Sequence, residues 1–224
     1  KLSHIHFVAN ETAKKRLTQL GEKEESIYVI GSPDIDIMNS DNLPNIDNVK
    51  NYYEFKFDNY AILAFHPVTT EVQKIKNQIK IVVDTILSLK QNFIVIYPNN
   101  DHGTNIILEE YLRLKNRENI KIYPSMRFEY FLALLKNSDF IIGNSSSGIR
   151  EAPHLGVPSL NLGTRQNNRI SCDLVLQVDI NKKSIKKAIN SIDKIDKKPF
   201  NFFGDGKSAK LFYNKIRQTS FWKI

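Results

Sequence analysis

Short apolar runs rich in β-branched and aromatic residues alternate with helix-like patterns along nearly the whole chain. The runs span residues 4–9, 27–31, 60–66, 93–98, 120–123, 140–144, 158–163 and 174–179. Between the third and the fourth run, apolar residues recur at helical spacing, at Val72, Ile75, Ile79, Val82, Ile86 and Leu89. A second helical stripe joins Phe128, Phe131, Leu132 and Leu135. This alternation predicts an α/β fold in which a doubly wound parallel sheet carries helices on both faces.

The alternation is interrupted twice, and the interruptions suggest where domains meet. Residues 31–58 are polar and rich in Asn without a clear period, so we interpret this segment as a linker. The preceding part supplies only two strands and one helix, which is too little for a doubly wound domain. We therefore expect residues 1–42 to be the tail and linker of an N-terminal domain, and a second break at 199–206 to precede a terminal helix within residues 199–224. Because the chain opens on Lys1 without an initiator Met, we expect it to come from a longer protein.

Charge narrows the range of partners. The 224-residue chain has a formal net charge of +8 at pH 7, which fits either a polyanionic partner or a solubilising surface. Much of the excess lies between residues 182 and 198, where seven Lys accompany two Asp without any Arg or aromatic residue. Nucleic-acid-binding surfaces usually combine Lys with those missing residues, so we expect no nucleic-acid partner.

Cysteine content and hydropathy indicate the compartment. Cys172 is the one cysteine, which excludes an internal disulfide framework and a four-cysteine zinc site. No apolar run approaches the roughly 18 residues that a membrane span requires. We therefore expect a soluble, cytoplasmic protein without a membrane partner.

The most informative segment joins an apolar strand to a helix through small polar residues. Its Gly143-Asn144-Ser145-Ser146-Ser147-Gly148 turn would direct free backbone N–H groups toward the carboxyl edge of the sheet, which favours anion binding. The serine hydroxyls add donors for phosphate oxygens. Glu151, about one turn further on, would repel phosphate but could accept both hydroxyls of a ribose. The alternative is that the turn only caps the helix.

Three other motifs are excluded. A serine nucleophile elbow requires Gly where Ser147 stands. Gly206-Lys207-Ser208 is not part of a phosphate-binding P-loop, because Asn201 occupies the position of the required earlier Gly. No Gly-x-Gly-x-x-Gly fingerprint occurs, which disfavours a bound nicotinamide or flavin dinucleotide, and we expect no cofactor.

Three more strand ends carry polar residues. His66 follows an apolar run and precedes Pro67, and imidazole exchanges protons near neutral pH, although a structural role is the alternative. Asn99 belongs to an Asn/Asp/Gly-rich stretch that could equally be a simple turn. Arg165 follows the 158–163 run and carries a planar guanidinium suited to phosphate.

Four strand ends thus bring residues that could bind a ligand to one predicted edge of the sheet. Together they are stronger evidence for a binding site there than any single motif is. The remaining histidines, His4, His6, His102 and His154, lack metal-ligand spacing with acids or Cys172, so we expect no bound metal.

These motifs resemble those of the UDP-N-acetylglucosamine 2-epimerase family. The resemblance rests on His66-Pro67-Val68-Thr69-Thr70, Gly143-Asn144-Ser145-Ser146 and Asn161-Leu162-Gly163-Thr164-Arg165-Gln166, in this order, and it extends to Gly204-Asp205-Gly206-Lys207. The sequences of these motifs are most similar to those of the hydrolysing branch, which makes N-acetylmannosamine or a 2,4-diacetamido-6-deoxy analogue for sialic or legionaminic acid synthesis. It implies two Rossmann-like domains in a glycosyltransferase-B-like arrangement, with residues 43–198 as the C-terminal nucleotide-binding domain and 199–224 as a helix that crosses back to the first domain.

The resemblance also implies roles for individual residues. Ser145 and Ser146 would hold the diphosphate, and Glu151 the ribose hydroxyls. Asn99 and Arg165 would line the nucleotide side of the cleft. His66 would lie at the diphosphate and the sugar, where it would assist the departure of UDP.

The implied reaction eliminates UDP across C1 and C2 to give a glycal, to which water then adds with inversion at C2. The acid/base carboxylates come from the first domain in this family, so we expect this chain alone to be inactive. For the intact parent we expect UDP and a UDP-N-acetylhexosamine as ligands, and a homo-oligomeric state. The alternatives are a non-hydrolysing epimerase, a glycosyltransferase-B-like glycosyltransferase and a non-catalytic nucleotide-binding module.

Overall fold

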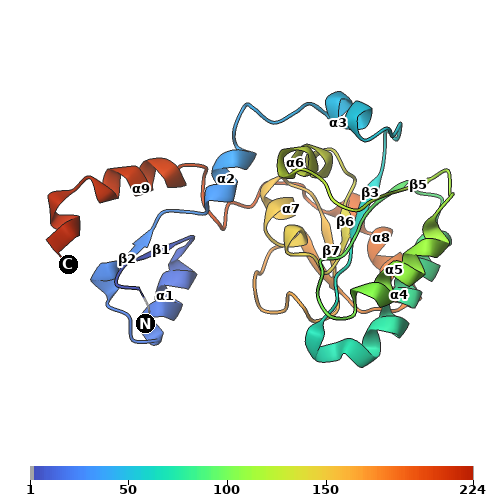
Figure 1. Ribbon diagram of the computed structural model, residues 1–224, viewed down its shortest axis with the longest axis horizontal. Helices are drawn as coiled ribbons and strands as arrows, with labels where there is room; N and C mark the ends of the chain where they lie inside the picture. Colours follow the sequence, from blue (N-terminus) through green and yellow to red (C-terminus); the bar gives the residue numbers. More distant parts are fainter. Residues whose placement is uncertain (1–2, 224) are drawn as a thin grey trace. The chain divides into compact units, whose positions relative to one another are not determined.

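The structure is a computed structural model that describes residues 3–223. Lys1, Leu2 and Ile224, which the expected segments 1–42 and 199–224 include, lie outside the described residues. The chain forms two compact units, one of residues 44–200 and one that combines residues 1–43 with 201–224. Figure 1 labels the α-helices and most strands of both units.

The larger unit is built on a parallel sheet. Its strands are β3 (Ala61–Ala64), β4 (Phe93–Ile96), β5 (Ile120–Tyr123), β6 (Ile141–Gly143), β7 (Ser159–Leu162) and β8 (Val175–Val178). They lie in the order β5-β4-β3-β6-β7-β8, and all neighbours pair in parallel. The chain winds outward from β3 on one side and from β6 on the other, so the strand order reverses between these two. The predicted doubly wound parallel sheet is therefore confirmed.

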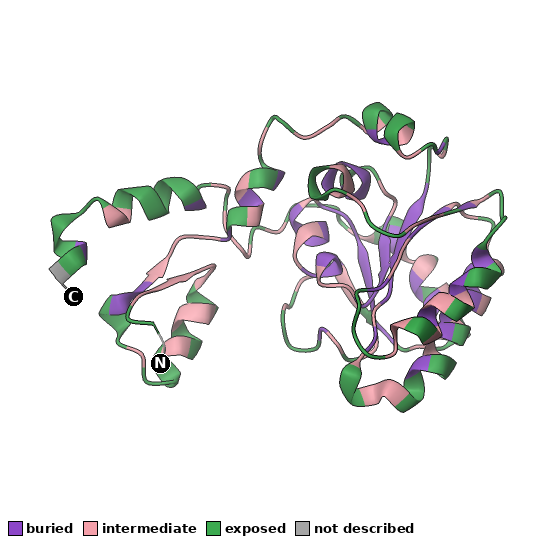
Figure 2. Ribbon diagram, in the orientation of Figure 1, coloured by how far each residue is buried: buried purple, intermediate pink, exposed green. Residues whose placement is uncertain are grey.

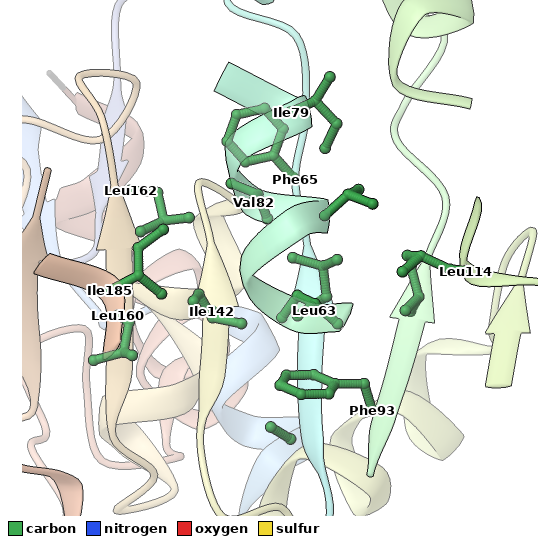
Figure 3. Close-up of a cluster of buried hydrophobic side chains, with 14 of the residues drawn as sticks. Leu63, Phe65, Ile79, Val82, Phe93, Leu114, Ile142, Leu160, Leu162 and Ile185 are labelled. Atoms are coloured by element: carbon green, nitrogen blue, oxygen red, sulfur yellow. The ribbon is translucent and has the colours of Figure 1, made fainter. Parts of the chain in front are cut away.

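One face of this sheet is covered by α4 (Val72–Leu87), α5 (Thr104–Tyr111) and α8 (Lys182–Ile189). The apolar stripe predicted for α4 turns toward the sheet, since Ile75, Ile79, Val82 and Ile86 are at most 1 % exposed. Figure 3 shows Ile79, Val82 and Ile185 beside the sheet residues Leu63, Ile142 and Leu160. Burying one such side chain contributes about 1.5–3 kcal/mol, so this layer fixes the sheet on which the site depends.

The other face is covered by α3 (Ile46–Tyr52), α6 (Phe128–Lys136) and α7 (Glu151–His154). Val49, Ala133 and Ala152 of these helices pack in one cluster with Ile62 and Ile141 of the sheet. In Figure 2 the central strands β3 and β6 are buried along their whole length, whereas β5 and β8, at the two edges of the sheet, are only partly buried. Strands that are buried on both faces are expected to be apolar throughout rather than alternating, as the sequences of β3 and β4 are.

Residues 31–58, interpreted as a linker, contain regular structure. They include α2 (Pro33–Met38) and the whole of α3. Helices of six and seven residues are too short to show a clear helical period in the sequence. Pro33 occupies the first turn of α2, where a missing N–H costs nothing.

The smaller unit contains a two-stranded parallel sheet. Its strands are β1 (His6–Val8) and β2 (Ile27–Val29), and its helices are α1 (Glu11–Gln19), α2 and α9 (Ser208–Ile216). The Asp36 carboxylate of α2 accepts hydrogen bonds from the N–H groups of Ser208 and Ala209, at 2.9 and 2.8 Å, and so caps α9. The ring of Phe7 in β1 lies 4.8 Å from that of Phe212 in α9. The terminal helix therefore packs in one unit with the start of the chain.

The described residues also contain short 3₁₀ helices, at Glu24–Ser26, Thr69–Glu71, Leu112–Leu114, Ser146–Gly148, Ile192–Lys194 and Thr219–Lys223. Each of the eight apolar runs contains a strand that is equal to or slightly shorter than the predicted one. The assignment of residues 1–42 to the tail of a further domain stays a prediction.

Candidate functional site

A pocket of about 400 Å³ opens at the carboxyl edge of the large sheet, where the strand order reverses. It is lined by residues that end or follow β3, β4, β5 and β6: Ala64, His66, Ile96, Tyr97, Pro98, Asn99, Pro124, Ser125, Met126, Phe128, Phe131, Ser145, Ser147 and Glu151. Doubly wound sheets bind ligands at such reversal points. The lining combines apolar side chains, such as Met126 and Phe131, with polar ones, such as His66 and Glu151, which is typical of a small-molecule site.

The six predicted site residues do not all line this pocket. Its lining includes His66, Asn99, Ser145 and Glu151. Ser146 lies next to Ser145 in the same turn. Arg165, after β7, is half-buried and reaches the β6 turn through its side chain.

The β6 turn depends on Gly143, whose φ is +140°. A Cβ atom there would lie 2.0 Å from the main-chain carbonyl oxygen of Ala64 in β3, so only Gly allows the two strands to approach this closely. Ser145 caps the following turn and accepts a hydrogen bond from the Ser147 hydroxyl at 2.9 Å. The helix expected after the serines begins as one 3₁₀ turn and continues as the four-residue α7. The hydroxyls and the nearby guanidinium are therefore better anion partners than the dipole of so short a helix.

His66 is held in one orientation by its neighbours. Its ring Nδ1 accepts a hydrogen bond from the main-chain N–H of Asn99 at 3.0 Å. Because a main-chain N–H can only donate, Nδ1 carries no proton and the neutral ring presents Nε2–H as a donor. Burial, reinforced by the positive charge of Arg165, lowers the pKa of His66 to about 4, although the side chain of Asn99 and the charge of Asp101 act in the opposite direction. His66 is therefore neutral at pH 7.

The loop that carries Asn99 is ordered by its own side chains. The side-chain amide of Asn99 donates to the Asp101 carboxylate, and the hydroxyl of Thr104 donates to the main-chain carbonyl of Asn99. This internal bonding fixes the main-chain N–H of Asn99 that orients the His66 ring. Asn99 thus contributes its main-chain N–H to the site as well as its place in the pocket wall.

Arg165 and Gln166 join the β7 loop to the β6 turn. Arg165 Nη1 and Gln166 Nε2 both donate to the main-chain carbonyl of Asn144, at 3.1 and 2.9 Å. Burial lowers the pKa of Arg165, but a guanidinium stays protonated at neutral pH. Its positive charge is therefore present beside the pocket.

Sequence reasoning missed two groups of residues. Ser125, Met126, Phe128 and Phe131 line the pocket from the end of β5 and the start of α6. The predicted strand at 120–123 ends at the same edge as the others, and the polar Ser125 after it is the signal that could have included this loop. The second group, Asn144 and Gln166, is buried, and the sequence pattern gave no sign that their side chains bind the main chain of neighbouring loops.

The described residues also bear on metals and membranes. Within residues 3–223, no group of three or more His, Cys, Asp or Glu side chains is placed to hold a metal ion. In the same part of the chain, no helix combines the length and the hydropathy of a membrane span.

Comparisons with known proteins agree with the fold. A model of the UDP-N-acetylglucosamine 2-epimerase family matches residues 1–217. A structure of Methanocaldococcus jannaschii UDP-GlcNAc 2-epimerase in complex with UDP-GlcNAc and UDP superposes with a TM-score of 0.75 at 23 % identity, over 96 % of this chain and 61 % of that one. The Neisseria meningitidis UDP-GlcNAc 2-epimerase bound to UDP-GlcNAc gives the same TM-score of 0.75 at 20 % identity, over 96 % and 62 % of the two chains.

Proteins found by sequence comparison share a higher sequence identity with this chain than those two structures do. A Neisseria meningitidis serogroup B UDP-N-acetylglucosamine 2-epimerase is 45 % identical over 100 % of this chain and 60 % of the relative. A Legionella pneumophila UDP-N,N'-diacetylbacillosamine 2-epimerase (hydrolyzing) is 35 % identical over 97 % of this chain and 58 % of the relative. The chain thus spans about 60 % of the length of these relatives. Because both the family match and the identity extend over nearly the whole chain, the protein belongs to the UDP-N-acetylglucosamine 2-epimerase family.

Proposed function

We propose that this chain is the UDP-binding part of a hydrolysing UDP-N-acetylglucosamine 2-epimerase. The intact parent would release UDP and N-acetylmannosamine, or a 2,4-diacetamido-6-deoxy analogue, for sialic or legionaminic acid synthesis. The observation that carries the proposal is the pocket in which the ends of β3, β4, β5 and β6 meet. The hydrolysing outcome is supported by the 35 % identical Legionella relative, whose name states it.

The pocket suggests how UDP is held. Ser145 and Ser146 offer hydroxyl donors to the diphosphate, and Arg165 supplies the positive charge beside them. Glu151 lines the same pocket and accepts the ribose hydroxyls. Asn99, from the loop after β4, lines the pocket on the nucleotide side. Phosphate oxygens and a guanidinium form strong, charge-assisted hydrogen bonds, so Arg165 accounts for much of the expected affinity.

His66 assists the departure of UDP as a hydrogen-bond donor. Its pKa of about 4 leaves too little imidazolium at pH 7 for it to act as the main proton donor. The Nε2–H of the neutral ring instead stabilises the negative charge that develops on the leaving oxygen, which is the task of preorganised donors in such reactions. A bound diphosphate would offset the charge of Arg165 and raise the pKa of His66.

The reaction breaks the C1–O bond and removes the proton from C2, which gives UDP and a glycal. Water then adds its oxygen to C1, and a proton returns to the opposite face of C2. A carboxylate of suitable pKa must exchange the C2 proton, and we assign it to the domain that precedes residue 43. This chain alone is therefore inactive, and residues 1–42 and 199–224 complete the connection to that domain.

The product of the intact parent distinguishes the alternatives. With UDP-GlcNAc or its 2,4-diacetamido-6-deoxy analogue in D₂O, a hydrolysing enzyme gives the free 2-epimerised sugar, which carries deuterium at C2. Run in H₂¹⁸O, the same reaction leaves the UDP without ¹⁸O, because the C1–O bond breaks. A non-hydrolysing epimerase returns UDP-ManNAc, and a glycosyltransferase yields no 2-epimerised sugar. Either of these last results, read by proton and phosphorus NMR and by mass spectrometry, overturns the proposal.

A matched pair of histidine variants tests the role of His66. In the intact parent, His66→Gln is expected to lower kcat/KM by about 100-fold, the smaller end of the range for proton-transfer and donor groups. His102→Gln changes an exposed histidine of the β4 loop and is expected to leave kcat/KM within about twofold. If the two substitutions changed kcat/KM by the same factor, His66 would have no specific role in the reaction.

A further inference from the structure

Asn144, at the end of β6, is 1 % exposed. Its main-chain N–H donates to the main-chain carbonyl of Ala64 in β3 at 3.1 Å. Near the start of the same two paired strands, β3 and β6, the N–H of Ile62 donates to the carbonyl of Phe140 at 3.0 Å. A parallel ladder repeats these bonds at even spacing along the strands. In a regular ladder the N–H of His66 would therefore bond to the main-chain carbonyl of Asn144.

The structure replaces that bond with a side-chain bond. The N–H of His66 donates to Oδ1 of Asn144 at 2.6 Å, and Nδ2 of Asn144 donates to the carbonyl of His66 at 2.8 Å. The side-chain amide thus extends the ladder beyond the end of both strands. Both main-chain polar groups of His66 are satisfied by this one amide.

The exchange releases the main-chain carbonyl of Asn144 for other partners. It accepts hydrogen bonds from Arg165 at 3.1 Å and from the buried Gln166 at 2.9 Å. One residue of β6 therefore holds the loop after β3 through its side chain and the loop after β7 through its main chain.

The chemistry of this position favours Asn over its nearest relatives. The amide combines an acceptor and a donor on one short planar group. An ionised Asp carboxylate would have no hydrogen to donate and would repel the His66 carbonyl, while Gln is one methylene longer. The buried site would also oppose an unpaired charge.

We propose that Asn144 is a positioning residue that sets His66 and Arg165 toward the diphosphate at the same time, by replacing its main-chain oxygen with its side-chain oxygen in the β3–β6 ladder. The catalytic part of this inference, the orientation of both residues toward the diphosphate, rests on the proposed function. Its structural content, the joint control of two loops, can be tested without a ligand.

The ligand-free test observes the His66 ring in the 224-residue chain labelled with ¹⁵N histidine, with His66→Gln used to assign its signals. The wild-type ring is expected to show an unprotonated Nδ1 and a depressed pKa. In Asn144→Ala, the His66 N–H returns to the main-chain carbonyl and the ring loses its fixed place against Asn99. We then expect a mixture of both tautomers and a pKa closer to that of free histidine, near 6.5.

A control separates this effect from a general loss of stability. Asn119 also donates its side-chain amide to a main-chain carbonyl, that of Gln91 at 2.9 Å, but it lies before β5 at the opposite edge of the sheet. Asn119→Ala should lower the melting temperature without changing the His66 signals. If Asn144→Ala folds and its His66 signals match those of the wild type, the inference is wrong.

Gln166→Met keeps the inference testable if Asn144→Ala does not fold. It removes one hydrogen bond to the released carbonyl and does not touch His66 directly. The His66 signals should then shift in the direction predicted for Asn144→Ala, by a smaller amount. Unchanged signals in a folded Gln166→Met chain would overturn the inference.

A double-mutant cycle on UDP affinity tests the link to Arg165. Asn144→Ala should raise the Kd for UDP by about tenfold, the effect of losing two hydrogen bonds. Arg165→Ala should then weaken binding by a smaller factor in the Asn144→Ala chain than in the wild type, because the arginine is already displaced. Equal factors contradict the coupling. If the wild-type chain and its intact parent bind no UDP, the proposed function fails, and the His66 signals still decide the present inference.

Discussion

At the scale of single residues, His66 illustrates how neighbours select one protonation state. A main-chain donor fixes its tautomer, and burial together with Arg165 lowers its pKa to about 4. The same histidine on an exposed loop would be partly charged at pH 6.5. The pocket therefore presents a neutral donor, with the permanent positive charge of Arg165 beside it.

This protonation state predicts a pH dependence of stability. The unfolded chain protonates His66 near pH 6.5 and the folded chain near pH 4. Between these values the unfolded state binds more protons, so the free energy of unfolding falls as the pH drops, by up to about 3 kcal/mol for this group. In His66→Gln this contribution is absent. Urea unfolding of both chains at several pH values should show the wild type losing more stability than the variant on going from pH 7 to pH 4, and parallel losses would contradict the pKa.

At the scale of elements, the site depends on how strands end. The sequence predicted the strands well, because strands buried on both faces read as continuous apolar runs bounded by polar turns. It also identified four of the pocket-lining residues, since polar residues directly after such runs must gather at one edge. It missed the amide bonds of Asn144 and Gln166, because a long-range bond between a side chain and the main chain leaves no periodic trace in sequence.

The close approach of β6 to β3 yields a second stability prediction. Gly143→Ala would place Cβ 2.0 Å from a main-chain oxygen at a φ of +140°, so a backbone shift is unavoidable. We expect a loss of about 3 kcal/mol or more. Gly163→Ala is the matched control, because its φ of +71° is also positive but its Cβ would meet only the flexible end of Ile180 at 3.2 Å. That variant should lose about 1–2 kcal/mol, and equal losses in urea unfolding would show that the contact with Ala64 does not matter.

At the scale of the whole molecule, the chain divides into one unit with a full six-stranded sheet and one unit with a two-stranded sheet. Residues 44–200 contain the whole parallel sheet, both of its helical layers and the pocket. The other unit has a two-stranded sheet, and so small a sheet is seldom stable without further strands or helices against it. The larger unit therefore has the parts of an independent domain.

A fragment of residues 44–200 tests this division. We expect it to unfold in one cooperative transition and to bind UDP with a Kd within about threefold of that of the full chain, because the pocket takes all its lining residues from this unit. Circular dichroism and calorimetry would measure the two properties. A fragment that is folded but has lost UDP binding would show that the smaller unit contributes to the nucleotide site.

The central claim is that the pocket holds UDP, and a calorimetric titration of the 224-residue chain tests it most directly. The account predicts saturable binding that Glu151→Ala and Arg165→Ala each weaken by about tenfold or more, as expected for hydrogen bonds to charged groups. Glu118→Ala and Arg117→Ala change exposed residues before β5 at the opposite edge and should bind UDP like the wild type. Equal binding by all four variants, or no binding up to millimolar UDP by the chain and by its intact parent, would contradict the account.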